Sequence, residues 1–283
     1  MKHHYSDYYQ SVADYYNANH ARFLRFGQRG ETGAMHRAVW GPGVQNRIET
    51  LQFVNHLIAR EISEIFHEKL PDIHILDIGC GVGATCMYLA KELGVPCTGV
   101  SVSQAQVDEA NDRAEIADCG DRCDFLLQDF TVMTDSRRFQ CASAVESFVH
   151  FEKLRRFFQK CAELLSSEGI LIICDDFRSM GIEKNSEAQT YLIRFKKGWR
   201  LGNILGIQEI KEFAGNAGFS LEFNRNLSPC LRVPNGIPEH LEKLAYLIPF
   251  RTPFLDSRRR SVALRRCYKN GWLEYRFLVF RKF

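Results

Sequence analysis

One stretch limits the possible folds more than any other part of the chain: HILDIGCGVGATCMYLAKEL, residues 74–93. It reads as a buried strand, then a turn with three glycines within 79–83, then a helix with one apolar side. Glycine is needed where the backbone turns sharply and must lie closer to a ligand than a Cβ would allow. The free N–H groups that open the next helix point to the same place. The stretch therefore predicts a ligand-binding turn at the end of a strand.

The glycine spacing separates two classes of nucleotide-binding protein. Nicotinamide dehydrogenases also place three glycines after a first strand, but as G-x-G-x-x-G. Here the sequence is DIGCGVG, starting at Asp77, and it resembles motif I of the class I S-adenosylmethionine (SAM)-dependent methyltransferases. The resemblance implies that the backbone of Gly79, Cys80 and Gly81 holds the methionine part of the cofactor, and that Asp77 belongs to the same cofactor-binding site. A purely structural glycine turn is the alternative.

Strand and helix patterns alternate on either side of this turn. We expect strands at 73–78, 96–102, 123–128, 141–145, 170–176, 219–227 and 272–280, with helices at 84–93, 103–117, 152–165 and 207–217. Repeated βα units imply a parallel sheet with helices on both faces and ligands beyond the carboxyl ends of the strands. The expected fold class is α/β, a Rossmann-like class I methyltransferase sheet. In the resembled family the last strand is antiparallel and marks the edge of the sheet.

The remaining segments are expected to cover this sheet. Residues 1–70 read as a helical N-terminal extension over the site, with an aromatic helical region at 5–26 and a long amphipathic helix at 45–70. Residues 71–283 form the SAM-binding domain. Two insertions, at about 177–206 and 228–270, do not belong to the minimal sheet, and long insertions in a compact domain are usually functional. We expect them to form a substrate cap.

The segment after the second strand departs from most class I methyltransferases. They carry an acid that binds both ribose hydroxyls, whereas this chain reads GVSVSQAQ from Gly99 to Gln106. That segment resembles the sterol, tocopherol and cyclopropane fatty-acid group of methyltransferases. The resemblance implies that Ser101 and Gln106 bind the ribose and adjacent groups. Ser103 and Gln106 also have the spacing of a capping box that would open a helix, and both roles are compatible.

The third strand ends in Gln128-Asp129-Phe130, which resembles the family's Asp-Phe motif. The resemblance implies that Asp129 accepts a hydrogen bond from the adenine amine and that Phe130 lies beside the ring. An acid at a strand end is also common in ordinary loops.

The fourth strand runs into ESFVHF, from Glu146 to Phe151. In the resembled fold this strand end faces the methyl group, so its side chains meet both cofactor and acceptor. Alignment supplies much of the rate of an in-line methyl transfer. Methylation of an alkene also builds a carbocation, which a carboxylate stabilises before a base removes a proton. The pattern resembles sterol and tocopherol methyltransferases and makes Glu146 and His150 the catalytic candidates. The alternative is that Glu146 caps a helix and His150 packs in the core.

Substrate candidates come from two regions. DYYNANHARFLRFG and MHRAVWGPGV resemble, loosely, the segment before motif I in small-molecule C-methyltransferases, where tyrosines close over the SAM pocket and His and Trp line the substrate side. In the first insertion an aromatic and a basic residue lie in the expected cap. Core packing is the competing explanation for each of these side chains. The substrate candidates are Tyr15, Tyr16, His36, Trp40, Trp199 and Arg200.

Charge is divided unevenly along the chain. Residues 1–176 hold 17 Lys and Arg against 25 Asp and Glu, whereas residues 177–283 hold 20 against 9. The total of +3 argues against nucleic-acid binding. The basic C-terminal part is either a solvated surface or a source of cations for an anionic substrate. Mg²⁺ is expected only if that substrate is a diphosphate.

Composition limits cofactors and location further. The ten cysteines are scattered with no paired Cys or His spacing, so we expect reduced core residues and no metal site. No apolar run approaches the roughly 18 residues of a membrane helix, and MKHHYSDYYQ has the features of neither a signal nor a transit peptide. We therefore expect a cytoplasmic enzyme. The sequence does not determine its oligomeric state, and a homodimer is compatible with it.

Together these features predict a SAM-dependent methyltransferase that acts on a small molecule and releases S-adenosylhomocysteine (SAH). C-methylation of an unsaturated isoprenoid or lipid-like acceptor is the first choice, with a prenyl diphosphate as a narrower form. The alternatives are O- or N-methylation of a small natural-product metabolite with His150 as base, or a SAM-binding cyclase or sensor that does not methylate.

Overall fold

The computed structural model describes residues 7–26, 36–233 and 253–283 of the chain. Tyr5, predicted to begin the first helical region, and residues 234–252 of the second cap insertion lie outside these ranges. So do the side chains of Arg258–Arg260, which belonged to the predicted basic helix.

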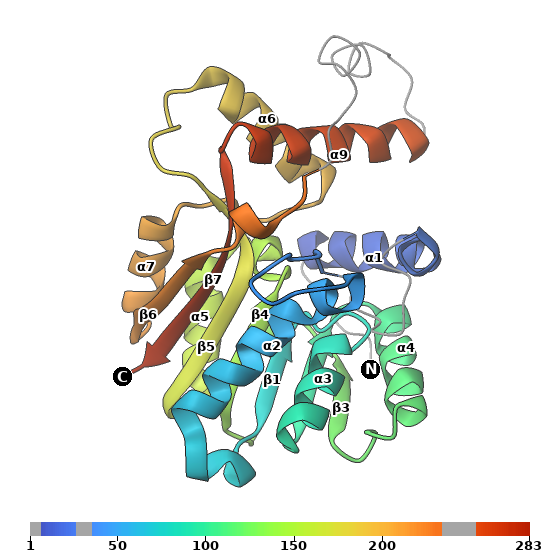
Figure 1. Ribbon diagram of the computed structural model, residues 1–283, viewed down its shortest axis with the longest axis vertical. Helices are drawn as coiled ribbons and strands as arrows, with labels where there is room; N and C mark the ends of the chain where they lie inside the picture. Colours follow the sequence, from blue (N-terminus) through green and yellow to red (C-terminus); the bar gives the residue numbers. More distant parts are fainter. Residues whose placement is uncertain (1–6, 27–35, 234–252) are drawn as a thin grey trace.

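A seven-stranded sheet forms the centre of the molecule, in the order β3-β2-β1-β4-β5-β7-β6 (Figure 1). Pairings among the first five strands are parallel, as the alternating βα pattern predicts. The strands are β1 Ile75–Ile78, β2 Cys97–Ser101, β3 Cys123–Leu127, β4 Phe139–Val145, β5 Leu165–Arg178, β6 Phe219–Asn226 and β7 Leu273–Lys282. The predicted α/β fold class is therefore confirmed.

The last strand is antiparallel, as predicted, but its expected place at the sheet edge was wrong. β7 lies between β5 and β6 and pairs with both, and β6 forms the edge. Burial explains the order. Residues 277–280 of β7 are buried on both faces, whereas most of β6 is partly or fully exposed. A strand with two apolar faces is stable only between neighbours.

Helices cover both faces of the sheet. On one face α2 (Arg47–Phe66), α3 (Ala84–Leu93) and α4 (Gln104–Ile116) contribute to one apolar cluster. On the other face α5 (Leu154–Leu164) and α7 (Ile207–Gly215) contribute to a second. α2 ends earlier than predicted because His67 has φ 37°, outside the right-handed helical region, and a short 3₁₀ helix follows to Asp72.

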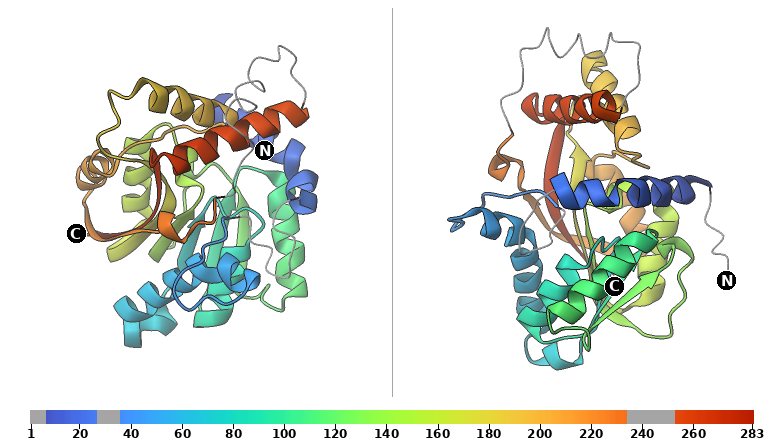
Figure 2. Two further views of the ribbon diagram at one scale, coloured as in Figure 1. Left: turned by 45° about the horizontal axis from the view of Figure 1, so that its top comes forward. Right: turned by 90° about the vertical axis from the view of Figure 1, so that its right-hand side faces the viewer.

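Three further helices lie beyond the carboxyl ends of the parallel strands (Figures 1 and 2). α1 (Asp7–Phe26) comes from the N-terminal extension, α6 (Ser186–Gly198) from the first insertion and α9 (Pro253–Lys269) from the second. α6 and α9 pack against each other through an apolar cluster that includes Tyr191, Ala263 and Trp272. The helices of the two insertions thus form one cap, although residues 199–252 separate them in the sequence.

All ten cysteines are free thiols, and nine are buried. Within the described ranges, no helix is both long and apolar enough to cross a bilayer.

Candidate active site

A cavity of about 530 Å³ opens where the carboxyl ends of β1 to β5 meet α1 and the cap. Because β3, β2, β1, β4 and β5 are neighbours in that order, the residues that follow them form a row. Asp129 stands at one end, then Ser101, then the glycine turn, then Glu146 and, at the other end, the Asp175–Asp176 pair. The row matches the order in which the sequence assigns adenine, ribose, methionine and acceptor.

The glycine turn after β1 needs glycine for two reasons. Gly79, Gly81 and Gly83 have φ angles of 75°, 55° and 79°, in the left-handed region that side chains disfavour. A Cβ on Gly79 would also lie 2.5 Å from the Cβ of Ser147. Gly79, Cys80 and Gly81 all line the cavity, the two glycines add no side chain there, and α3 begins directly behind them at Ala84.

Asp77 lines the cavity from the end of β1, but its carboxylate is bound from within the protein. Ser143 Oγ donates to Oδ1 at 2.8 Å, and Cys86 Sγ donates to Oδ2 at 3.7 Å. Burial raises the pKa of Asp77 to about 6. The residue can contribute charge to the cavity above that pH, at a cost in stability.

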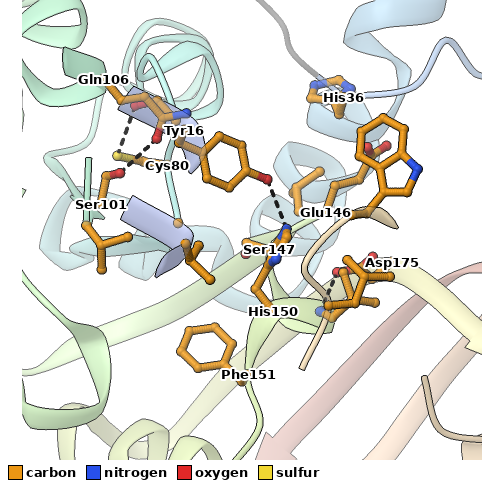
Figure 3. Close-up of a pocket in the computed structure, with 18 of the residues that line it drawn as sticks. Tyr16, His36, Cys80, Ser101, Gln106, Glu146, Ser147, His150, Phe151 and Asp175 are labelled. Carbon is orange, nitrogen blue, oxygen red and sulfur yellow. Dashed lines mark hydrogen bonds between the residues drawn. The ribbon is translucent and has the colours of Figure 1, made fainter. Parts of the chain in front are cut away.

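Ser101 and Gln106 contact each other where the ribose is expected, with Ser101 Oγ donating to Gln106 Oε1 at 2.9 Å (Figure 3). Ser103 caps α4 by accepting from Gln106 N at 3.3 Å. The Gln106 side chain turns toward Ser101, so the predicted capping box forms only on the Ser103 side. Asn17 of α1 accepts from Ser103 Oγ at 2.6 Å, which ties the N-terminal extension to this turn.

Asp129 and Phe130 lie at the far end of the row. Asp129 Oδ1 accepts from both the N–H and the hydroxyl of Thr131 at 2.8 Å, which sets the orientation of the carboxylate. Phe130 is buried, with its ring centroid 5.9 Å from that of Phe151, and both residues line the cavity. This end therefore offers one acceptor beside an apolar wall.

The turn after β4 places Glu146 and His150 on the same cavity. Glu146 has φ 50°, and Ser147 Oγ donates to the carbonyl of Ile78, so the turn is held against the glycine loop. His150 Nε2 lies 2.9 Å from the Tyr16 hydroxyl (Figure 3). Its Nδ1 lies 3.1 Å from the carbonyl of Arg200. Strained backbone conformations of this kind cluster at functional sites.

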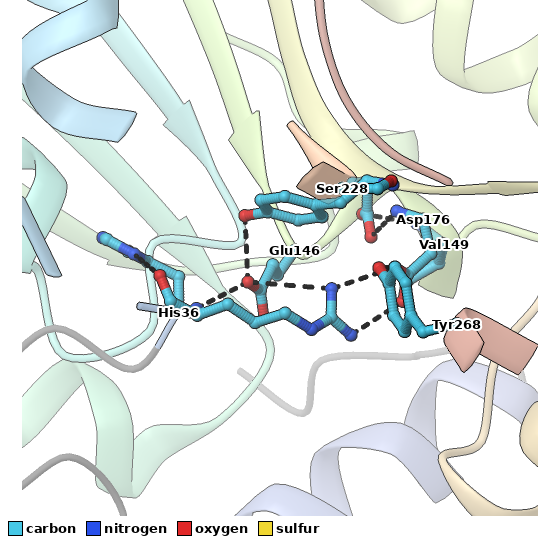
Figure 4. Close-up of polar contacts among 9 residues, drawn as sticks. His36, Glu146, Val149, Asp176, Ser228 and Tyr268 are labelled. Carbon is cyan, nitrogen blue, oxygen red and sulfur yellow. Dashed lines mark hydrogen bonds and ion pairs between the residues drawn. The ribbon is translucent and has the colours of Figure 1, made fainter. Parts of the chain in front are cut away.

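Glu146 belongs to a polar network that reaches across the sheet (Figure 4). Its Oε1 accepts from the backbone N–H of Arg37 at 2.7 Å and from the Tyr275 hydroxyl at 2.9 Å. The Arg37 guanidinium donates to both oxygens of Asp176, at 2.9 and 2.8 Å, and Tyr268 donates to Asp176 as well. Both bonds to Glu146 end on one oxygen, so the carboxylate is held in a single orientation.

Acidic residues outnumber basic ones in the lining. Of the described residues that line the cavity, five are acidic and one, Arg37, is an arginine or lysine. Burial, with the neighbouring charge of Asp176, raises the pKa of Asp175 well above its usual range. Burial lowers the pKa of both His36 and His150, so each imidazole is neutral at neutral pH.

The substrate candidates divide into two sets. Tyr15, Tyr16, His36 and Trp199 line the cavity. Trp40 is not among the lining residues, and the guanidinium of Arg232 stacks 3.3 Å from the centre of its ring. Arg200 is also absent from the lining and takes part through its backbone carbonyl, which binds His150.

Several contacts are invisible in the sequence patterns. Arg37 stands beside His36 in a segment that was noted only for its His and Trp, and Asp176 was noted only as a strand end. Tyr275 looked like an ordinary β-strand residue, and Asn17 like a polar helix position. These four residues share only one feature in the sequence, a polar side chain within an apolar or aromatic stretch. Without the fold, this feature does not identify the partner of the side chain.

This fold and this row of residues define the class: a class I SAM-dependent methyltransferase. More narrowly, the chain belongs to the mycolic acid cyclopropane synthetase family, which matches residues 65–231.

Curated relatives are similar over part of the chain. The O-methyltransferase resE of Aspergillus sclerotiorum is 27% identical over 177 residues, 62% of this chain and 65% of that protein. The ubiquinone biosynthesis O-methyltransferase of Coxiella burnetii is 28% identical over 54% of this chain and 61% of that protein. The sterol 24-C-methyltransferase of Yarrowia lipolytica is 23% identical over 56% of this chain and 42% of that protein. The chain thus spans less than two thirds of these relatives' lengths.

Solved structures share the whole fold at low identity. The cyclopropane synthase MmaA2 from Mycobacterium tuberculosis has a TM-score of 0.73 at 18% identity, covering 97% of this chain and 98% of that one. Geranyl diphosphate C-methyltransferase from Streptomyces coelicolor A3(2) has a TM-score of 0.72 at 17% identity, covering 98% and 99%. The [4+2]-cyclase SpnF has a TM-score of 0.72 at 20% identity, covering 96% and 95%.

Proposed function

We propose that the chain binds SAM in this cavity and transfers its methyl group to a small molecule, with SAH as product. The residues fit the cofactor in order along the sheet edge. The backbone of Gly79, Cys80 and Gly81 would hold the methionine part, Ser101 and Gln106 the ribose, and Asp129 with Phe130 the adenine. Structures of the geranyl diphosphate methyltransferases carry SAM or SAH, which supports the same cofactor here.

We propose carbon as the methyl acceptor, in an unsaturated isoprenoid or lipid-like molecule. The observation that carries this choice is Glu146, a carboxylate held in one orientation at the end of β4 beside an aromatic wall. Bound SAM supplies an electrophilic methyl group. Methyl addition to an alkene creates positive charge on the acceptor, and electron-rich rings and a carboxylate are the groups that stabilise it. The aromatic residues that line the cavity are Tyr9, Tyr15, Tyr16, Phe130, Phe151, Phe195 and Trp199.

The rest of the lining would orient the acceptor and exclude water. Tyr9 is buried and packs on Phe151, with ring centroids 6.1 Å apart, and so seals the cavity between α1 and the sheet. Phe195 and Leu264 bring apolar surface from α6 and α9 of the cap. A carbocation is quenched by water, so a dry pocket and an aligned acceptor together favour methylation.

Measured SAH release tests the acceptor class. Purified protein with SAM would be given prenyl alcohols, sterols, phenols and amines, and SAH would be quantified by mass spectrometry. A unit charge about 4 Å away is worth about 4 kcal/mol at an effective dielectric of 20. Arg37 offsets part of the charge of Glu146 and therefore part of this stabilisation. We therefore expect Glu146→Gln to lower kcat/KM on an alkene acceptor by about 10²-fold. Glu163→Gln, on the outer surface of α5, is the control. A nearly intact rate in Glu146→Gln would remove the carbocation role.

A diphosphate acceptor is the second candidate, favoured by the basic composition after residue 177 and by the position of α9. Ser261 and Leu264 of that basic helix line the cavity. Among the charged residues of the described lining, however, acids outnumber bases by five to one, which favours a neutral acceptor over an anionic one. Turnover of geranyl diphosphate against geraniol, with and without Mg²⁺, separates the two. Equal rates would eliminate the charge argument.

Two alternatives remain open to test. O- or N-methylation, which the resE and ubiquinone relatives suggest, would show SAH release with phenols or amines and little effect of Glu146→Gln. A non-methylating role, suggested by the fold shared with SpnF, would show SAM binding by calorimetry but no SAH with any acceptor.

A further inference from the structure

Arg37 lies between two carboxylates and binds them unequally (Figure 4). Its two terminal nitrogens, Nη1 and Nη2, donate to the two oxygens of Asp176 at 2.9 and 2.8 Å. Nη1 lies 3.9 Å from Glu146 Oε1, which is too long for a hydrogen bond. The planar fork of an arginine matches one carboxylate in this two-point geometry, so the guanidinium is committed to Asp176.

Two tyrosine rings limit where this guanidinium can turn. Its Cζ lies 5.5 Å from the centre of the Tyr268 ring on α9 and 5.1 Å from the centre of the Tyr275 ring on β7. Aromatic faces attract a guanidinium, but they do not select one carboxylate over another. The choice of partner therefore depends on Asp176, whose Oδ1 also accepts from the Tyr268 hydroxyl.

Asp176 has the contacts of an ionised acid. Three donors, two from Arg37 and one from Tyr268, favour its charged form. Burial raises the pKa of Asp176 above its ordinary value, although the charge of Arg37 and the Tyr268 hydroxyl hold it down. Its neighbour Asp175 accepts from two backbone N–H groups, and burial with the charge of Asp176 raises the pKa of Asp175 well above its usual range. Of these two acids, Asp176 is therefore the one that carries the charge.

This pairing decides which charge an acceptor meets. Two carboxylates, Glu146 and Asp176, stand against one guanidinium, so the three groups leave one net negative charge. Because Arg37 and Asp176 offset each other at contact distance, that charge resides on Glu146. Glu146 Oε1 accepts from the Arg37 N–H and from Tyr275, whereas Oε2 has no hydrogen-bond partner among the described residues. Glu146 lines the cavity, so Oε2 is the oxygen left to meet positive charge on an acceptor.

We propose that Asp176 is a positioning residue that holds the Arg37 guanidinium away from Glu146 and so leaves the charge of Glu146 to the acceptor. This rests on the proposed function. Without the charge of Asp176, Glu146 is the remaining described carboxylate in ion-pair range of Arg37, at 3.9 Å, and the two would pair directly. A carboxylate paired in this way stabilises a developing cation less, because the adjacent guanidinium repels the same positive charge.

Arginine side-chain NMR tests this arrangement without any acceptor. Protein labelled with ¹⁵N-arginine would be saturated with SAH, and the Arg37 guanidinium signals would be assigned by their loss in Arg37→Met. A guanidinium bound at both ends rotates slowly, so we expect separate Nη1 and Nη2 signals in wild type. These signals should persist in Glu146→Gln and merge or shift in Asp176→Asn. Their absence from wild type, or their loss in Glu146→Gln, would overturn the proposal whether or not Asp176→Asn folds.

Turnover tests the consequence for the methyl transfer. With any acceptor that releases SAH, Asp176→Asn should lower kcat/KM by about 10-fold, because a paired carboxylate keeps only part of its field. The double variant Arg37→Met/Asp176→Asn removes both members of the pair and should recover most of that loss, since Glu146 again has no guanidinium beside it. SAH affinity should stay near wild type in both. Asp124→Asn, which breaks an exposed pair with Arg137, is the control.

The double variant distinguishes charge separation from a purely structural role. If Asp176 only stabilised the fold around Arg37, removal of both side chains would lower kcat/KM at least as much as Asp176→Asn alone. That result, or a normal kcat/KM in Asp176→Asn, would refute the proposal. Failure of wild type to bind SAH would instead refute the proposed function, and the NMR comparison would then be made without SAH.

Discussion

Gly79→Ala is the sharpest test of the structure, because two separate penalties fall on one methyl group. Gly79 has φ 75°, a conformation that alanine disfavours, and the new Cβ would lie 2.5 Å from Ser147 Cβ. Ser147 cannot move aside freely, since its hydroxyl is bonded to the carbonyl of Ile78. The clash would therefore be transmitted to the turn that carries Glu146.

A matched control separates the two penalties. Gly94, at the end of α3, has φ 70°, but a Cβ there would meet nothing within 4 Å. Gly94→Ala should lower the free energy of unfolding by about 1–2 kcal/mol, the cost of placing alanine in the left-handed conformation. Gly79→Ala should add to this the clash of the new Cβ with Ser147, about 1–3 kcal/mol. Its total loss in free energy of unfolding should be about 2–5 kcal/mol.

Urea unfolding followed by circular dichroism measures both losses, and calorimetric titration with SAH measures the effect on the cofactor. We expect Gly94→Ala to bind SAH normally and Gly79→Ala to bind it weakly or not at all. Adding Ser147→Gly to Gly79→Ala removes the clashing atom and should recover part of the stability. Equal destabilisation by the two alanines, with SAH affinity intact in both, would refute the close approach of the glycine turn to the β4 turn.

Three further predictions concern charge. Arg37→Met should destabilise the protein by about 3–5 kcal/mol in urea unfolding, because it leaves the buried carboxylate of Asp176 without its cation. Arg60→Met, which breaks an exposed pair with Glu64, should cost about 0–1 kcal/mol, and equal losses would contradict the burial. The pKa of Asp77 is about 6 in the folded protein, above its value in the unfolded chain, so ionisation of this carboxyl opposes folding. Asp77→Asn should therefore raise the free energy of unfolding at pH 8, where Asp77 is ionised, but not at pH 4. The lowered pKa values of His36 and His150 keep both rings neutral in the folded protein, whereas the unfolded chain binds their protons below about pH 6.5. The melting temperature should therefore fall as the pH drops below about 6.5, and it should fall less steeply in His150→Gln. An equal pH dependence of the melting temperature in wild type and His150→Gln would refute a neutral, buried His150.

Local patterns were sufficient to find the part of the site that we propose binds the cofactor. The strand, glycine turn and helix at 74–93 are set by neighbouring residues, because backbone freedom and helix-end donors are local properties. Ser101 and Asp129 could then be placed beside the turn from the expected sheet alone, since parallel strands bring their carboxyl ends to one edge. The structure puts these residues on one cavity in the predicted order.

The acceptor side could not be read in the same way. Glu146 and His150 were recognised as candidates, but their partners lie far away in the chain. Arg37 reaches Glu146 across 109 positions, Tyr275 across 129, and Tyr16 reaches His150 across 134. No periodicity records such pairs, because they depend on how α1 and β7 dock on the sheet.

The sequence by itself determined a parallel α/β sheet with a SAM-type glycine turn at its first strand, because hydrophobic periodicity and glycine spacing act over a few residues. Only the tertiary structure decided that β7 lies between β5 and β6, because that order depends on which strand has two faces to bury. That placement brings Tyr275 to Glu146, and the docking of α1 brings Tyr16 to His150. The contacts of Glu146 and His150 therefore follow from packing between distant segments, which a linear pattern does not contain.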